Sequence, residues 1–174
     1  MIKLIKQDFK KNSEMFEKIK LELRKYIKSS IPIDHVGSTA IPNLYGKNII
    51  DIVIGVEDNL EFNSVNNILE NIGYIPSKKS KDEIYQFFSS IEGETSSGDI
   101  HIHVVLKNTE RYNEFLILKK YLLINEEEAK NYSDYKRELL DLGIQDRKEY
   151  KKNKSIYVTN LLIRAKKWYN VYGK

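Results

Sequence analysis

A single carboxylate interrupts one aliphatic run of this sequence, and two histidines alternate with aliphatic residues in another. Asp51 lies within residues 49–54, and His101 and His103 lie within residues 99–106. Aspartate is rare in strands, and an ionised carboxylate is costly to bury unless a cation or hydrogen-bond donors compensate for it. Imidazole is a common metal ligand and can act as a general base near neutral pH. These residue types therefore indicate a cation site or a proton-transfer site.

The spacing of the two histidines places them on one face of a strand. Side chains alternate between faces, so His101 and His103 share a face with Asp99 and Val105, and the opposite face is aliphatic. Residues two apart in a strand lie roughly 6 to 7 Å from each other, close enough to share one ligand. A histidine on a half-buried strand is more often an ordinary hydrogen-bonded residue. Spacing alone therefore leaves an Asp/His cation site and a structural role as alternatives.

Composition sets the broad class of the protein. The chain has 174 residues, of which 41% are hydrophobic and 31% are charged, and it contains no cysteine. We expect one domain spanning residues 1–174, without disulfides, thiolate nucleophiles or thiolate metal sites. No segment approaches the roughly 20 apolar residues needed to cross a bilayer. We therefore expect a cytoplasmic protein with no membrane partner.

The charge pattern favours a solvated surface. The formal net charge is +4, and lysines are interleaved with glutamates along most of the sequence. A nucleic-acid reader more often carries a one-sided basic stripe with aromatic residues, so a nucleic-acid partner is not expected. RNA binding by a basic helical third is kept as an alternative, which salt-sensitive RNA binding would reveal. Two basic clusters, residues 78–81 and 148–154, could face a polyphosphate.

Hydrophobic periodicity predicts a mixed sheet flanked by helices and followed by an all-helical C-terminal third. Helical spacing is expected over residues 7–29, 58–71, 110–124, 126–142 and 155–170. Strands are expected over residues 33–37, 48–56, 84–91 and 100–106, the last two joined as a hairpin through the glycine- and serine-rich residues 93–98. The predicted fold class is α+β, with a sheet core over about residues 30–107 and C-terminal helices over about residues 110–170.

Two blocks of this sequence are similar to the signature of a known family. Residues 35–42 read His-Val-Gly-Ser-Thr-Ala-Ile-Pro and are followed by Lys47 and by Ile-Ile-Asp-Ile at residues 49–52. A second block, His-Ile-His-Val-Val, occupies residues 101–105. Both blocks resemble those of the GrpB family. The resemblance extends over about residues 33–140 and includes Tyr121, Leu122, Ala129, Tyr132 and Lys136.

The resemblance implies a polymerase-β-like nucleotidyltransferase fold. In that superfamily a Gly-Ser turn at a helix start binds nucleotide phosphates, and strand carboxylates hold a divalent metal. Carried over, it implies a metal site at Asp51, His101 and His103, with Mg²⁺, Mn²⁺ or Zn²⁺ as the cofactor. It also implies binding of a nucleoside triphosphate. The residues implied in that binding are Gly37, Ser38, Thr39, Lys47 and Lys136.

One departure bears on activity. Superfamily enzymes usually present two carboxylates two residues apart, whereas this sequence has Val53 two residues after Asp51. A site with two imidazoles is softer than an all-carboxylate one, which shifts its preference toward Mn²⁺ or Zn²⁺. The missing second carboxylate also argues against two-metal catalysis, which needs carboxylates that bridge two ions.

Two functions remain open at this point. In the first, the protein transfers a nucleoside monophosphate to an unidentified small-molecule or protein acceptor. Asp51, His103 and His35 would be the catalytic residues, with His35 or His103 as the base. In the second, it is a non-catalytic nucleotide- or metabolite-binding module of the same fold. The acceptor, the nucleotide and the oligomeric state are not given by the sequence.

Overall fold

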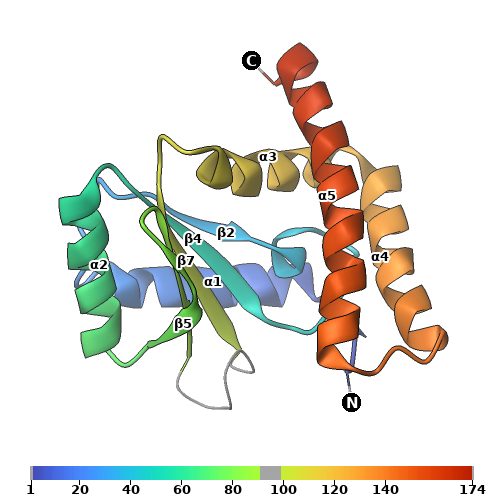
Figure 1. Cartoon of the computed structure of the whole chain (residues 1–174), viewed down its shortest axis with the longest axis horizontal. Helices are drawn as coiled ribbons and strands as arrows, with labels where there is room; N and C mark the ends of the chain where they lie inside the picture. Colours follow the sequence, from blue (N-terminus) through green and yellow to red (C-terminus); the bar gives the residue numbers. More distant parts are fainter. Residues whose placement is uncertain (1, 91–98, 174) are drawn as a thin grey trace.

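A five-stranded mixed β-sheet lies at the centre of the structure, a computed structural model that describes residues 2–90 and 99–173 (Figure 1). The strands, in spatial order, are β2 (Ile33–Val36), β4 (Ile50–Val56), β7 (Ile100–Leu106), β6 (Tyr85–Ser89) and β5 (Ile75–Asp82). The β4–β7 pair is parallel, and the other three pairs are antiparallel. A separate two-stranded ribbon pairs β1 (Ile5–Lys6) with β3 (Tyr45–Gly46).

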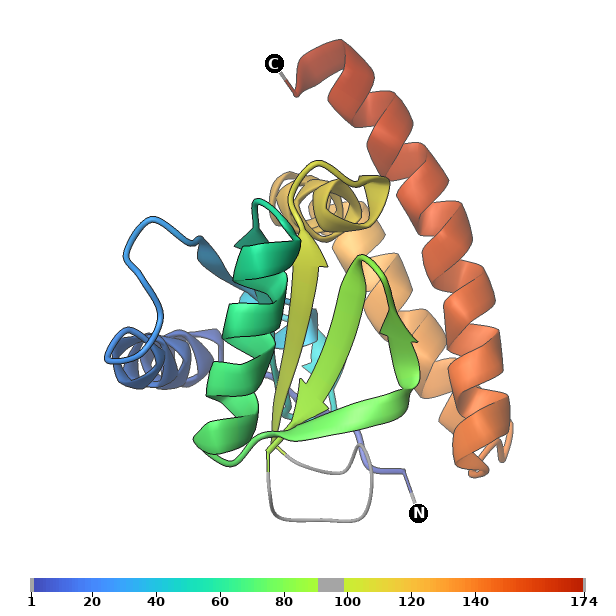
Figure 2. The same ribbon diagram turned by 60° about the vertical axis from the view of Figure 1, so that its left-hand side comes forward.

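Helices cover both faces of this sheet (Figures 1 and 2). They are α1 (Phe9–Leu23), α2 (Asn59–Asn71), α3 (Glu110–Ile124), α4 (Glu126–Asp141) and α5 (Arg147–Tyr172), with a three-residue 3₁₀ helix, η1 (Ser38–Ala40). Helices α1 and α2 pack on one face in the largest apolar cluster, and α3 packs on the other. Helices α4 and α5 continue the layer formed by α3, and α5 extends beyond it (Figure 2).

The two central strands are aliphatic because both of their faces are covered. On β4, Ile50, Ile52 and Ile54 face the cluster under α1 and α2. The alternate residue Val53 belongs to the cluster under α3. Asp51 has the same parity as Val53, so it points to the α3 side of the sheet, near the strand start. The alternation therefore determines which helices enclose the carboxylate.

Side-chain caps set the helix starts. The oxygens of Asp8, Asp58, Thr109, Asn125 and Asp146 accept hydrogen bonds from backbone N–H groups in the first turns of α1, α2, α3, α4 and α5. Such caps satisfy donors that have no partner within the helix. The cap of α5 matters most for the site, because it starts this helix early enough to include the basic residues 148–154.

The predicted fold class is confirmed: a mixed sheet is flanked by helices and followed by a helical C-terminal third, and the β6–β7 hairpin is antiparallel. Helix α3 has the predicted bounds. The prediction for residues 93–98, and for the end of the strand before them, lies outside the described residues. Within the described part of the chain, no helix combines the length and apolar character needed to cross a membrane.

Two helices and one strand differ from the elements predicted from the sequence. Helix α1 ends at Leu23, earlier than predicted, and the chain then turns through residues 24–30. Helix α5 begins at Arg147, earlier than predicted, because its first two turns are mostly polar and carry a weak periodic signal. Strand β5 was not predicted, because it is an edge strand rich in exposed lysines.

Candidate functional site

The parallel pairing of β4 with β7 places the two histidines beside the carboxylate strand. In the register, Asp51 is opposite His101, and Val53 is opposite His103. His101 Nδ1 lies 3.2 Å from Asp51 Oδ1 and makes a hydrogen bond with it, and His103 Nε2 lies 4.0 Å from the same oxygen. The side chains of Asp51, His101 and His103 are 25%, 15% and 16% exposed, so the cluster is mostly desolvated yet still open to solvent. The structure therefore brings together the three residues predicted to bind metal.

The charges in this cluster are set by competing effects. Burial raises the pKa of Asp51, but the hydrogen bond with His101 and the electrostatic interactions with both histidines and Lys154 outweigh it, so the net shift is downward. Burial lowers the pKa of His103 to about 4, against the attraction of Asp51. At neutral pH the carboxylate is therefore ionised and His103 is neutral, the protonation states in which both groups bind metals.

Gly37 lies directly against the Asp51 carboxylate. Its φ is 72° and its ψ is −168°, a conformation that is essentially restricted to glycine. A Cβ at this position would lie 2.3 Å from Asp51 Oδ2. Ser38 follows, and its hydroxyl packs so closely on Gly46 that a Cβ there would lie 2.4 Å from Ser38 Oγ. The predicted phosphate-binding turn and the predicted metal ligand are thus adjacent in space.

His35 and Thr39 are placed differently from the other predicted site residues. His35 is opposite Ile52 in the register, and its ring stacks on Phe16 of α1 at a centroid distance of 4.8 Å. Its Nε2 lies 2.9 Å from Thr39 Oγ1, which donates its own proton to the carbonyl of Ile49 at 3.0 Å. Both side chains are buried and brace the turn between β2 and β4. The structure does not bring His35 together with the His101–His103 pair, and its role as a base stays a prediction.

Lys136 lies on α4, in the helical layer that faces Asp51. It is 3% exposed, donates a hydrogen bond to the carbonyl of Tyr45, and lies 4.4 Å from the ring centroid of Tyr132. Burial lowers its pKa to about 7, the charge of Lys154 lowers it further, and Asp51 opposes both effects. The ammonium group of Lys136 donates to a carbonyl rather than to a carboxylate, so its positive charge is not neutralised by a directly bonded anion.

Further cations converge on this place from α5 and from the β3–β4 connection. Lys47 lies 5.2 Å from the ring centroid of Tyr150, and its pKa is lowered by desolvation and then by the charges of Lys154, Arg147 and Lys151. The charge of Lys154 also acts on Asp51, His103 and Lys136. Of the basic cluster predicted at residues 148–154, Lys154 therefore acts on Asp51 and His103, and this lysine was not singled out by the sequence.

An aromatic wall beside the histidines was also missed. The Tyr85 hydroxyl lies 2.8 Å from His103 Nδ1. Phe87 meets the His101 ring edge-on at 4.9 Å between centroids, and Phe115 of α3 lies 4.8 Å from the His103 ring. Tyr85 and Phe87 share one face of β6 because they are two residues apart. That spacing was the available signal, although aromatic residues in strands more often indicate core packing.

The donor atoms suit a divalent metal ion. Ligand bonds of 2.0–2.1 Å in a tetrahedral site place neighbouring donors about 3.3 Å apart. The 3.2 Å separation of Asp51 Oδ1 from His101 Nδ1 matches this spacing, and the 4.0 Å separation from His103 Nε2 is wider. Across residues 2–90 and 99–173, no three His, Asp or Glu side chains form a preassembled metal-binding group. His101 Nε2 is buried without a hydrogen-bond partner, so this ring is still incompletely satisfied. One carboxylate and two imidazoles therefore fit a divalent metal in the chemistry of their donor atoms.

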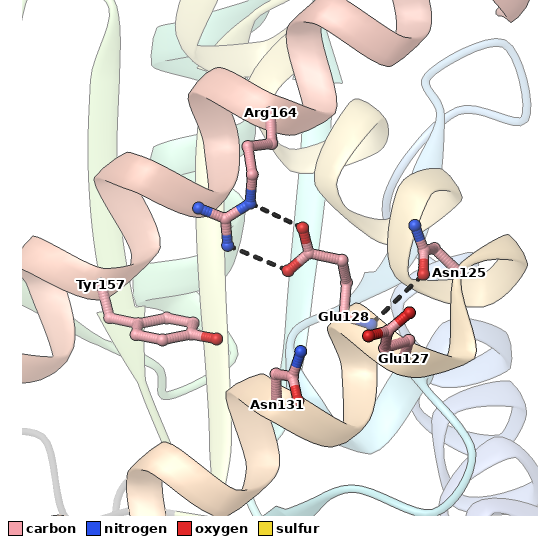
Figure 3. A pocket seen from close by; sticks show the side chains of 6 residues that line it. All are labelled: Asn125, Glu127, Glu128, Asn131, Tyr157 and Arg164. Carbon is pink, nitrogen blue, oxygen red and sulfur yellow. Dashed lines mark hydrogen bonds and ion pairs between the residues drawn. The ribbon is translucent and has the colours of Figure 1, made fainter.

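Away from the Asp51 cluster, a hollow lies between α4 and α5 (Figure 3), with a volume of about 380 Å³. Arg164 holds the carboxylate of Glu128 with two hydrogen bonds of 2.6 and 2.9 Å, and the Tyr121 hydroxyl adds a third of 3.0 Å. The remaining lining comes from polar and aromatic side chains, namely Asn125, Glu127, Asn131 and Tyr157. Its principal charges neutralise each other, so this hollow lacks the uncompensated charge of the Asp51 region.

The fold is similar to that of a terminal uridylyl transferase. The terminal uridylyl transferase Cid1 superposes on 76% of this chain with a TM-score of 0.50 and 14% identity, using 40% of its own length. That likeness concerns the fold alone. The model of the family described as "GrpB protein" matches residues 3–164, and the chain belongs to this family.

Its relatives agree with that assignment. The glutamate-rich protein GrpB of Alkalihalophilus pseudofirmus is 30% identical over 154 residues, covering 85% of this chain and 87% of the relative. A UPF0157 protein of Halalkalibacterium halodurans is 29% identical over 136 residues, covering 78% and 68%. The crystal structure of the conserved protein GrpB from Enterococcus faecalis superposes with a TM-score of 0.82 at 23% identity, covering 96% of this chain and 99% of that one. The resemblance drawn from the two sequence blocks is confirmed.

Proposed function

We propose that this protein transfers a nucleoside monophosphate from a nucleoside triphosphate to an acceptor hydroxyl, with a divalent metal bound at Asp51, His101 and His103. The likeness of the fold to that of a terminal uridylyl transferase supports this class of chemistry, and the arrangement of residues around Asp51 supports the site. The observation that carries the proposal is the convergence on one carboxylate of a glycine turn, two imidazoles and several cations.

The lysines around Asp51 would complement the negative charge of a triphosphate. Desolvation and then the charge of Lys154 lower the pKa of both Lys47 and Lys136, so these lysines lie in a region of excess positive charge. A triphosphate placed among them would neutralise this excess, and the absence of a side chain at Gly37 lets the turn lie directly against the Asp51 carboxylate, beside the proposed metal. A bound metal would polarise the phosphate oxygens and offset the charge that develops on them.

The reaction balances without a further reactant. The acceptor oxygen forms a bond to the α-phosphorus, the bond from that phosphorus to the bridging oxygen of the β-phosphate breaks, and pyrophosphate leaves. The proton of the hydroxyl passes to solvent, because phosphoryl-type transfer is driven mainly by positioning and charge stabilisation rather than by a strong base. A base at His103 or His35 stays a prediction from the sequence.

Metal binding gives the first test. Titration of the protein with Mn²⁺, followed by the loss of the free-ion signal in electron paramagnetic resonance, measures the affinity directly. Asp51→Asn is expected to lower that affinity at least about 10-fold, because the carboxylate charge is lost. Asp34→Asn is the matched control: Asp34 is opposite Val53 in the register, on the same face as Asp51, and Val53 separates it from His103. Equal affinity of the wild type and Asp51→Asn would refute the site.

A non-catalytic nucleotide-binding module is the second candidate, and Val53 favours it. Val53 occupies the usual place of a second carboxylate, is fully buried, and packs with Val36, Val105 and Tyr112. A second carboxylate ligand is therefore absent from this strand. Incubation with α-³²P-labelled nucleotides, Mn²⁺ and a panel of acceptor alcohols and proteins separates the two candidates. Label transfer that Asp51→Asn abolishes supports the enzyme, whereas nucleotide binding without transfer supports the module.

A further inference from the structure

The Tyr85 hydroxyl is the hydrogen-bonding group that contacts the far side of the His103 ring. It lies 2.8 Å from Nδ1, while Nε2 on the near side is directed at Asp51 Oδ1. The two ring nitrogens of a histidine are coupled, because the partner of one nitrogen determines where the proton of the other resides. The group at Nδ1 therefore controls what Nε2 can do toward Asp51.

Tyr85 is itself held in place from outside the cluster. The Arg111 guanidinium lies 4.5 Å from the centroid of its ring, and Arg111 makes a 2.7 Å hydrogen bond with Asp82. Asp82 is paired with Tyr85 in the β5–β6 register. The Arg111 guanidinium therefore packs on one face of the Tyr85 ring, and Asp82 of the edge strand β5 holds the guanidinium in place.

Apolar neighbours hold the His103 ring without determining its proton. Phe115 and Phe87 lie 4.8 and 5.3 Å from it between centroids. Such contacts restrict the position of the ring but offer no donor or acceptor at Nδ1. Burial raises the pKa of Tyr85 to about 12, so its hydroxyl keeps its proton and can either donate or accept.

We propose that Tyr85 is a positioning residue that holds the His103 ring through its hydrogen bond at Nδ1, so that Nε2 faces Asp51. Without a metal, the hydroxyl donates to Nδ1, and Nε2–H points toward the carboxylate. When Nε2 is needed as a ligand, the proton resides on Nδ1 and the hydroxyl rotates to accept it. Metal-binding histidines typically donate their other N–H to such a partner, whose loss costs about 10- to 100-fold in metal affinity. The last step rests on the proposed metal site.

The test compares Tyr85→Phe with Tyr112→Phe. Tyr112 is a matched control because it lies in the apolar cluster that Tyr85 packs against, and its hydroxyl bonds Asp34 rather than a histidine. Two quantities are measured on each variant: the ¹⁵N chemical shifts of the His103 ring nitrogens without metal, assigned with His103→Gln, and the affinity for Zn²⁺ and Mn²⁺. A purely structural role for Tyr85 would not shift the balance between the two nitrogens.

We expect Tyr85→Phe to change the Nδ1 and Nε2 shifts and to lower metal affinity about 10-fold, with both quantities unchanged in Tyr112→Phe. Wild-type shifts and wild-type affinity in Tyr85→Phe would overturn the inference and leave the metal site standing. If the wild-type protein binds neither metal, the proposed metal-dependent function fails, and the nitrogen shifts alone decide whether Tyr85 orients His103.

Discussion

Gly37 and Asp51 are in such close contact that the backbone of one leaves space only for the carboxylate of the other. A Cβ on residue 37 would lie 2.3 Å from Oδ2 and 2.9 Å from Cβ and Cγ of Asp51. Two independent constraints, the positive φ and this contact, therefore require glycine at the turn. The turn and the carboxylate behave as one unit.

Replacing Gly37 by alanine is expected to destabilise the protein by about 3 kcal/mol, because strain and overpacking add. Gly143→Ala is the control, since Gly143 also has a positive φ of 81° but a Cβ there would meet nothing within 4 Å. That variant should lose about 1–2 kcal/mol. Urea unfolding measures both changes. Equal losses would show that the contact with Asp51 has no energetic weight.

The stability of the wild type should rise between pH 7 and pH 9 because of Lys136. Its folded-state pKa of about 7 lies below the ordinary value of 10.5, so between these values the unfolded chain binds the extra proton. Stability then increases with pH, and the cost of burying this lysine is fully present below pH 7. Lys136→Met should flatten the dependence measured by urea unfolding, whatever its effect on absolute stability. Lys130→Met, on the solvent-exposed side of α4, should preserve the wild-type slope.

On the acid side, His35 should make the protein less stable as the pH falls below 6.5. Burial lowers the pKa of His35 from 6.5 to about 4, and the charge of Lys119 adds to the effect. The unfolded chain therefore takes up a proton between these values that the folded chain does not, and the loss is complete near pH 4. His35→Gln should show a shallower decline in thermal melting between pH 6.5 and pH 4.5. An unchanged decline would exclude His35 as its source and leave His103, which has a similar shift.

The Glu128–Arg164 pair should stabilise the packing of α4 on α5 (Figure 3). Arg164→Lys removes the two-pronged contact and should cost about 1 kcal/mol, a modest value because the arginine is 43% exposed. The exposed pair Lys130–Asp134 provides the comparison, and Asp134→Asn should cost less than about 0.5 kcal/mol. Arg164→Lys should leave Mn²⁺ affinity unchanged, because this pair does not contact the Asp51 cluster.

Sequence patterns could place Asp51, His101 and His103 on strands but could not give their distances. Alternating aliphatic residues indicate the strand and the face of each side chain, because burial on a sheet has a period of two. The pairing of Asp51 with His101, and of Val53 with His103, depends on the parallel register of strands that are not consecutive in the chain. No local signal encodes that register, so the family resemblance provided the grouping.

Two other site features required three-dimensional information. His35 is near Gly37 in sequence, but its pairing with Ile52 directs its ring to the α1 side of the sheet. Tyr85 is 18 residues from His103 and meets it because β6 pairs with β7. Lys154 joins the cluster through the docking of a helix whose first turns are mostly polar. Each depends on packing between distant segments rather than on residue type.

The parallel pairing of β4 with β7 has a consequence for folding. Asp51 and His101 are 50 positions apart, so the pairing of β4 with β7 must close a loop that contains helix α2 and strands β5 and β6. Contacts between residues this far apart in the sequence form only after the chain has lost most of the conformational entropy that closing the loop requires. Partially folded chains therefore lack the constellation, and a ligand selective for it binds the native state alone. Such a ligand raises the melting temperature by an amount that grows with the logarithm of its concentration relative to its Kd, so an unbiased thermal-shift screen of metals and nucleotides can identify what this protein binds.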